Sequence, residues 1–212
     1  MNRENDNDTP AQTRQKLLRA TEILLVREGV HALTVRRIAG EADVNSALVR
    51  YHFGGTDGLL DELALRNAAC MADARDALLE GLSETGPPHD FDEIVDALVL
   101  PLWAEAAMAP EHRAIIVLDE IFARSVPELH EKIWALFAEG VNRVTTELGR
   151  CLPDTDPTIL AWRIRFVTAA ALDVPPRATR SRSNDARSVY RKDDREERLH
   201  QFQLFARHAL RP

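Results

Sequence analysis

The chain has 212 residues, of which 45% are hydrophobic, and its formal net charge at pH 7 is −7. A chain of this size buries a full hydrophobic core in one or two domains. No run of about 18 apolar residues occurs, so the sequence predicts no membrane-spanning helix. Cys70 and Cys151 lie far apart within helical patterns, so they predict neither a disulfide framework nor a thiolate metal site, and a reducing cytoplasm is the natural setting.

Residues 1–9 are polar and acidic and lack the apolar core of a signal peptide, so we expect a disordered arm there. A first domain is expected over residues 10–56, beginning with the helix in TRQKLLRATEILLVREG. Between Pro10 and Gly55, seven basic side chains against four acidic ones leave a net charge of +3. The acidic excess therefore lies elsewhere, and the small positive footprint predicts modest, salt-dependent affinity for a polyanion.

Residues 34–53 have the spacing of two short helices joined by a sharp turn. Thr34 is placed as the N-cap of the first helix. Ile38 and Ala39 recur at helical spacing, and the helix is expected to end near Ala42. Asp43 then occupies the turn, where the backbone needs a left-handed residue and Asp tolerates that conformation better than most. This pattern predicts a helix-turn-helix, so residues 10–56 are expected to form a DNA-binding domain.

The second helix of the motif is expected to expose a face that fits the major groove of DNA. Its cap is Asn45 or Ser46, and its small or polar first residues allow close approach to base edges. Arg50 has a guanidinium that forks onto guanine or phosphate, and Tyr51 reaches a phosphate or a thymine methyl group. The inward side chains are expected to be Val44, Leu48 or Val49, and Phe53. The candidate DNA-binding residues are Thr34, Arg36, Asn45, Ser46, Ala47, Arg50, Tyr51, His52 and Thr56. The alternative is an ordinary helical hairpin with solvated polar residues.

Three strings carry a resemblance to a known family: the first helix ending in REG, then IAGEADV, then YHFGGTDGLL. Together they cover roughly residues 13–63, which resemble the N-terminal domain of TetR-type transcriptional regulators. Three positions depart from the family pattern: Asp43 replaces the turn glycine, Arg50 stands where a tyrosine is customary, with Tyr51 one place later, and Thr56 replaces the lysine that opens the fourth helix. Thr56 and the backbone N–H groups beside the preceding glycines are still expected to hold a phosphate.

Beyond residue 57 the pattern is one helix after another, without the alternating period of a strand, and it predicts an all-α fold. A long fourth helix is expected to end before GLSETGPPHD, with one face formed by Leu60, Leu63, Asn67, Met71, Ala74 and Leu78. Further helices are expected at Phe91 to Ala109, Glu111 to Arg124, about Val126 to Arg150, Pro157 to Val174 with Asp156 as cap, and about Arg195 to Leu210.

Residues 57–212 are expected to form a helical effector-binding and dimerisation domain. Pro101 lies within the predicted fifth helix and should bend its axis, opening space between helices. The candidate effector-binding residues are Asn67, Met71, Trp103, Met108, His112, Phe122, Trp134 and Phe137, with Asn67, His112 or Arg113 as polar anchor. The alternative is that these aromatic and methionine side chains are plain core. The resemblance to the TetR family implies an effector site in this domain without identifying its lining.

The last two predicted helices have apolar stripes that suit either the chain's own core or a four-helix interface between two chains. The stripes are Leu160, Ile164, Val167, Ala171 and Leu172 in one helix, and Leu199, Phe202, Phe205, Ala206 and Ala209 in the other. The family resemblance favours a homodimer, whose two reading heads match DNA half-sites roughly 34–36 Å apart. Residues 175–194 between these helices are polar and are expected to form a mobile loop, with a basic flap over DNA or over an anionic ligand as the alternative.

Motifs of common hydrolases, nucleotide-binding loops and zinc proteases are missing from the sequence, so we expect neither an enzyme nor a cofactor. We interpret the chain as a ligand-responsive transcriptional repressor that binds double-stranded operator DNA as a dimer and leaves it when a small molecule binds. An activator is possible with the same parts. The alternatives are an effector-independent DNA-binding protein and an enzyme on a helical fold.

Overall fold

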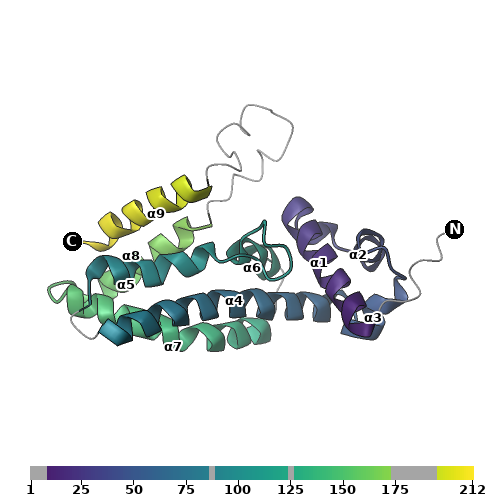
Figure 1. Ribbon diagram of the computed structural model, residues 1–212, viewed down its shortest axis with the longest axis horizontal. Helices are drawn as coiled ribbons and strands as arrows, with labels where there is room; N and C mark the ends of the chain where they lie inside the picture. Colours follow the sequence, from purple (N-terminus) through teal and green to yellow (C-terminus); the bar gives the residue numbers. More distant parts are fainter. Residues whose placement is uncertain (1–8, 86–88, 124–126, 173–194) are drawn as a thin grey trace, which may run out of the picture. The chain divides into compact units, whose positions relative to one another are not determined.

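The computed structural model describes residues 9–85, 89–123, 127–172 and 195–212, and over these residues the predicted all-α fold is confirmed (Figure 1). The described part of the chain has no named strand, and its isolated antiparallel bridge joins Glu105 to Arg113. None of the helices within it combines the length and the apolar character that a membrane span requires. The predicted loop at 175–194, and the predicted arm apart from its last residue, lie outside the described residues.

The chain divides into two compact units. One comprises Met1–Met71 and Ala104–Phe137, and the other comprises Ala72–Trp103 and Ala138–Pro212. Two long helices, α4 (Thr56–Thr85) and α7 (Pro127–Cys151), contribute residues to both units.

In the first unit, helix α1 (Pro10–Glu28) packs against α2 (Val35–Glu41), α3 (Ala47–Phe53) and α6 (Ala114–Phe122). Thr9 and Gln12 form a reciprocal capping box at the start of α1, which satisfies backbone donors that the helix itself leaves open. A short 3-10 turn, η1 (Val30–Ala32), follows after Gly29, whose φ of 83° ends the helix. The fully buried side chains of α1 are Leu17, Leu18, Leu24, Leu25, Thr21 and Glu22.

In the second unit, α5 (Phe91–Val99), α8 (Pro157–Ala170) and α9 (Arg195–Leu210) enclose a core together with the ends of α4 and α7. Helices α5 and α8 both pack against α9 (Figure 1). Asp156 caps α8 as predicted, because its carboxylate accepts the backbone N–H groups of Thr158 and Ile159 at 2.8 and 3.3 Å. These hydrogen bonds stabilise the ionised form and lower the pKa of Asp156.

The predicted fourth and fifth helices have different ends in the structure. Helix α4 continues past Gly81 to Thr85, because Leu79 and Leu82 are buried in the core of the second unit and tertiary packing outweighs the low helix propensity of glycine. Helix α5 ends at Val99 and passes into a 3-10 turn, η2 (Leu100–Trp103). Pro101 has no N–H to continue the α-helical ladder, so it ends the helix and the predicted bend within a longer helix is wrong.

Residues 104–113 form an irregular connection, and the predicted helix up to Ala109 is therefore wrong here. The backbone N–H groups in this connection donate to side chains from distant helices. That of Ala107 reaches Oδ1 of Asn67 at 3.1 Å. Those of Met108 and Ala109 reach Oε1 of the buried Glu22 at 3.2 and 2.9 Å. Because these donors have tertiary acceptors, the segment need not be helical to satisfy them.

Two further predicted boundaries are wrong, and two helices match. Helix α6 begins at Ala114, not Glu111, because the irregular connection extends through Arg113. Helix α8 ends at Ala170, and Ala171 and Leu172 form a turn. Helix α7 lies within one residue of its predicted bounds, and α9 covers the predicted range.

Candidate nucleic-acid interface

The first helix of the predicted motif has the expected cap and turn. The hydroxyl of Thr34 accepts the backbone N–H of Arg37 at 3.3 Å, so Thr34 caps α2. Asp43 has a φ of 53°, and the next residue, Val44, donates its N–H to the carbonyl of Ala39 at 3.0 Å. The left-handed turn at Asp43 thus ends α2 and redirects the chain towards α3.

Helix α3 combines a buried anchor with an exposed outer side. Val49 is fully buried and Leu48 is half-buried, so Val49 is the principal inward residue. Ser46 occupies the N-cap position without a side-chain hydrogen bond. The side chain of Asn45 accepts the backbone N–H of Ala47 at 2.8 Å, so the capping contact comes from Asn45.

Most of the predicted DNA-binding residues lie in α3 or directly before it. Tyr51 is 79% exposed, and its ring meets that of His52 edge to face with 5.0 Å between the ring centroids. The exposed residues at and around this helix are Asn45, Ser46, Ala47, Arg50 and Tyr51, with His52 half-buried. Thr34 and Arg36 are exposed at the start of α2, and Thr56 is the half-buried first residue of α4. Their contacts with DNA stay predictions.

Several basic side chains near these helices are already engaged with carboxylates. Arg37 contacts Glu28 at 2.6 Å, and Arg27 contacts Glu41 at 3.1 Å. The hydrogen bond from Arg37 and, to a smaller extent, that from Arg27 lower the pKa of Glu28. Elsewhere on α1, Arg14 pairs with Glu62 and Arg19 with Glu111. Within the described part of the chain, the exposed Arg36 and Arg50 have no ion pair, which leaves their charges to a partner.

The predicted effector-binding residues are divided between the two units. Trp103 belongs to the second unit, where its ring stacks on Phe202 of α9 with a centroid distance of 4.8 Å. The other predicted lining residues belong to the first unit. Trp134 is 56% exposed there, and Phe122 is 38% exposed, with its ring edge to face against His130. Met71 is buried, and Met108, His112 and Phe137 are half-buried.

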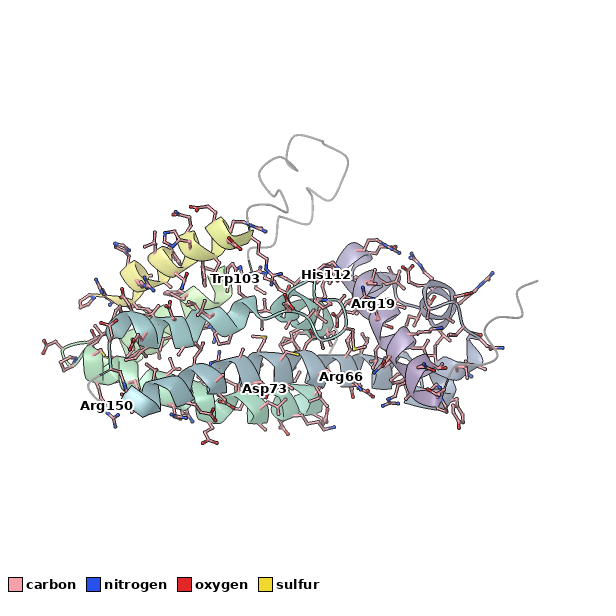
Figure 2. All side chains as sticks on the ribbon, in the orientation of Figure 1. Arg19, Arg66, Asp73, Trp103, His112 and Arg150 are labelled. Atoms are coloured by element: carbon pink, nitrogen blue, oxygen red, sulfur yellow. The ribbon has the colours of Figure 1, made fainter. Side chains whose placement is uncertain are left out.

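Asn67, a predicted effector anchor, has its polar groups engaged within the protein. Its Nδ2 donates to Oε2 of Glu22 at 3.1 Å and to the carbonyl of Leu63 at 2.9 Å, while Oδ1 accepts the N–H of Ala107. Nearby, Arg19 donates to the carbonyl of Met108 (Arg19 is labelled in Figure 2). Sequence reasoning missed Glu22, because its partners lie 45 to 87 residues away along the chain.

The apolar stripe predicted for the eighth helix packs inside the chain, while a second apolar side of that helix is exposed. Leu160, Ile164 and Val167 are buried in the core of the second unit. Ile159, Trp162 and Phe166 are 48%, 53% and 62% exposed, and their spacing places them on one side of α8. In α9, Ala206 is buried and Phe205 is 50% exposed. The exposed residues of α8 were missed because the helix is apolar on two sides.

Two family models match this chain. One, described as bacterial regulatory proteins of the tetR family, matches residues 17–63. The other, described as the tetracyclin repressor-like C-terminal domain, matches residues 96–207, which is more than half of the chain.

The chain spans about half the length, or less, of the curated relatives that it matches. The HTH-type transcriptional regulator BetI of Vibrio vulnificus (strain YJ016) is 34% identical over 100 residues, which are 46% of this chain and 49% of that protein. BetI 2 of Chromohalobacter salexigens is 31% identical over 83 residues, or 39% of this chain and 40% of that protein.

Solved structures of low sequence identity share the fold. A TetR-family transcriptional regulator from Mesorhizobium loti has a TM-score of 0.56 at 14% identity, covering 96% of each chain. A TetR-family regulator from Vibrio parahaemolyticus has a TM-score of 0.51 at 20% identity, covering 76% of this chain and 84% of that one.

Proposed function

This chain belongs to the TetR family of bacterial transcriptional regulators, and from that membership we propose that it is a ligand-responsive repressor. It binds a pseudo-palindromic operator as a homodimer in the cytoplasm, and a small-molecule effector releases it. The observation that carries the proposal is the exposed outer side of α3, where Arg50 and Tyr51 are exposed while Val49 is fully buried. A recognition helix needs this division between an anchored inner side and a free outer side.

The charges around α3 favour sequence-specific binding over non-specific electrostatic binding to DNA. Arg27 and Arg37 are paired with Glu28 and Glu41, so they attract phosphates less than free arginines would. Arg36 and Arg50 remain as exposed cations at the motif. Phosphate contacts fix register, whereas base contacts supply sequence information. We assign base reading to Arg50, with Tyr51 and the small residues Ser46 and Ala47 close to the groove floor.

The exposed apolar side of α8 supports a homodimer. Ile159, Trp162 and Phe166 are large apolar side chains on one side of a helix, and such clusters mark interaction surfaces when they are contiguous. The rings of Trp162 and Phe166 are in contact, with their centroids 6.0 Å apart. A two-fold interface through this side presents the same residues from both chains. The resulting pair of heads matches an operator with two half-sites.

The proposed effector acts by shifting a conformational equilibrium. It binds beside α4 and moves this helix, and the motion changes the separation of the two heads of the dimer. The hydrogen bond between Asn67 of α4 and Glu22 of α1 supports such coupling, because a shift of α4 pulls on a helix that packs against α3. A coupling of about 1–3 kcal/mol weakens operator binding by about 5–150-fold. Trp134→Ala is proposed to blunt this response.

The first experiment is selection of an operator by the wild-type protein from a random pool of DNA duplexes, followed by affinity measurement on the selected duplex. Arg50→Ala should weaken binding by about 1–3 kcal/mol and relax preference at the base it contacts. Selection with the variant reports which base loses its preference. An Arg50→Ala variant that selects the same duplex with the wild-type affinity at several salt concentrations contradicts the assignment of Arg50.

A further inference from the structure

The guanidinium of Arg14 in α1 joins three helices of the first unit. Its Nη1 donates to the carbonyl oxygen of His52, near the end of α3, at 2.7 Å. Its Nε donates to Oε1 of Glu62 in α4 at 3.2 Å, and Nη2 pairs with the second oxygen of the same carboxylate. The guanidinium carbon also lies 4.4 Å from the centroid of the Phe53 ring. The side chain of Arg14 thus contacts the last two residues of α3, and its charge is paired with Glu62 of α4.

The carbonyl of His52 is one of those that an α-helix leaves without an internal partner at its C-terminus. A cation at that position also complements the negative end of the helix dipole. Helix α3 has only seven residues, and a helix of that length has little stability of its own. Its orientation is therefore set by what holds its two ends and by the anchor Val49.

A second contact holds the same end of α3 against α4. An ideal Cβ on Gly58 would lie 2.2 Å from the carbonyl oxygen of Phe53, so only glycine allows this approach. Gly54, with a φ of 73°, ends α3 one residue after Phe53. The end of α3 thus packs closely against Gly58 and also accepts a hydrogen bond from Arg14.

We propose that Arg14 is a positioning residue for operator reading: it fixes the angle at which α3 presents Arg50 and Tyr51 to DNA. The proposal rests on the proposed function, because it assumes that α3 reads bases. Arg50 and Tyr51 directly precede His52, so a rotation of the last turn displaces both side chains from the base edges. Direct readout depends on aligned hydrogen bonds, whereas binding to phosphates tolerates small displacements.

Arg66 in α4 provides a matched control (labelled in Figure 2). It pairs with the same carboxylate, Glu62, at 2.8 Å, and its side chain is 42% exposed, against 37% for Arg14. Its hydrogen bonds go to Glu62 alone among the described residues. Arg66→Ala therefore removes a comparable ion pair and leaves the end of α3 untouched.

The experiment compares wild type, Arg14→Ala, Arg14→Lys and Arg66→Ala. For each protein, fluorescence anisotropy over a series of KCl concentrations gives the affinity for the duplex that the wild type selects and for an unrelated duplex of equal length. Thermal unfolding of each protein is measured alongside. Arg14→Ala should lose about tenfold in affinity for the selected duplex and less than about threefold for the unrelated one. Arg66→Ala should lose less than about twofold for either. Arg14→Lys should recover part of the loss, because an ammonium can still donate to the carbonyl of His52.

Several results would overturn the proposal. Equal losses for Arg14→Ala and Arg66→Ala would assign Arg14 to general stability. A fall of about 1.8 in the steepness of the salt dependence, about 0.9 for each chain of the dimer, would make Arg14 a phosphate contact. A wild type that selects no duplex refutes the proposed function and this inference together, whereas selection by the wild type with unchanged Arg14→Ala binding refutes the inference alone. If Arg14→Ala does not fold, Arg14→Lys decides, through the ratio of its affinity for the selected duplex to its affinity for the unrelated duplex. A ratio equal to that of the wild type overturns the proposal, and a smaller ratio supports it.

Discussion

At the scale of single residues, the turn between α2 and α3 depends on one backbone conformation. Asp43 has a φ of 53°, a region that side chains branched at Cβ strongly disfavour. Asp43→Val should therefore lower the free energy of unfolding by about 1–2 kcal/mol, as measured by urea denaturation. Asp43→Gly is the matched variant, because glycine adopts this conformation without a steric penalty. Equal stability of the Val and Gly variants would show that the turn does not restrain the motif.

Local signals explain why some residues were predictable from the sequence and others were not. Thr34, Asp43 and Asp156 act on backbone groups within a few residues, so short-range spacing identified them. Arg14 and Glu22 act on partners 38 to 87 residues away. Their patterns on α1 are those of ordinary helix residues, and only the packing of α1 against other helices reveals their contacts.

At the scale of elements, the buried carboxylate of Glu22 determines the shape of the connection at residues 104–113. Its loss would leave the backbone N–H groups of Met108 and Ala109 without their acceptor, and the amide of Asn67 would keep only the carbonyl of Leu63. Glu22→Leu should therefore lower the free energy of unfolding by about 2–4 kcal/mol in urea denaturation.

The control for this substitution is Glu111→Ala, which removes an exposed carboxylate near the same connection. Glu111 pairs with Arg19 at 3.4 Å, and its side chain is 40% exposed. Its loss should cost less than about 1 kcal/mol. If Glu22→Leu is as stable as Glu111→Ala, the buried hydrogen bonds contribute nothing that apolar packing cannot replace.

Periodicity predicted the presence of nearly every helix but not every helix end or buried side. Helix α5 could be read as continuing to Ala109 because the apolar pattern persists beyond Pro101, while the acceptors that draw residues 107–109 away come from α1 and α4. In α8 the apolar residues occupy two sides. The spacing of apolar residues alone does not identify which side of α8 packs in the chain's own core. In the structure, that side is formed by Leu160, Ile164 and Val167.

At the scale of the whole molecule, the proposed dimer makes a prediction about Trp162. Trp162→Ala should weaken self-association by about 2 kcal/mol if this residue is central to the interface, and sedimentation equilibrium measures the dissociation constant. Operator affinity should fall with it, because a monomer holds only one half-site. Trp134→Ala is the matched control: Trp134 is 56% exposed and Trp162 is 53% exposed. Equal effects of the two substitutions on association would contradict an interface through α8.

The net charge of −7 and the ion pairs around α2 together predict a shallow salt dependence of DNA binding. Arg50 is assigned to a base, so Arg36 supplies one exposed arginine per chain, and two per dimer, for phosphate contacts. At about 0.9 per neutralised phosphate, log affinity against log salt concentration should have a slope of about −2.

Glu41→Gln tests this account, because it removes the carboxylate that holds Arg27 at 3.1 Å. Arg27 then keeps only its pair with Glu28, at 3.0 Å, and its guanidinium gains access to phosphate. The variant should therefore bind an unrelated duplex more tightly and with a steeper salt dependence, as measured by fluorescence anisotropy over a KCl series. A wild-type slope of about −5 would mean that Arg27 and Arg37 leave their carboxylates on binding. The ion pairs would then be partners that DNA displaces, and Glu41→Gln would change affinity without changing the slope.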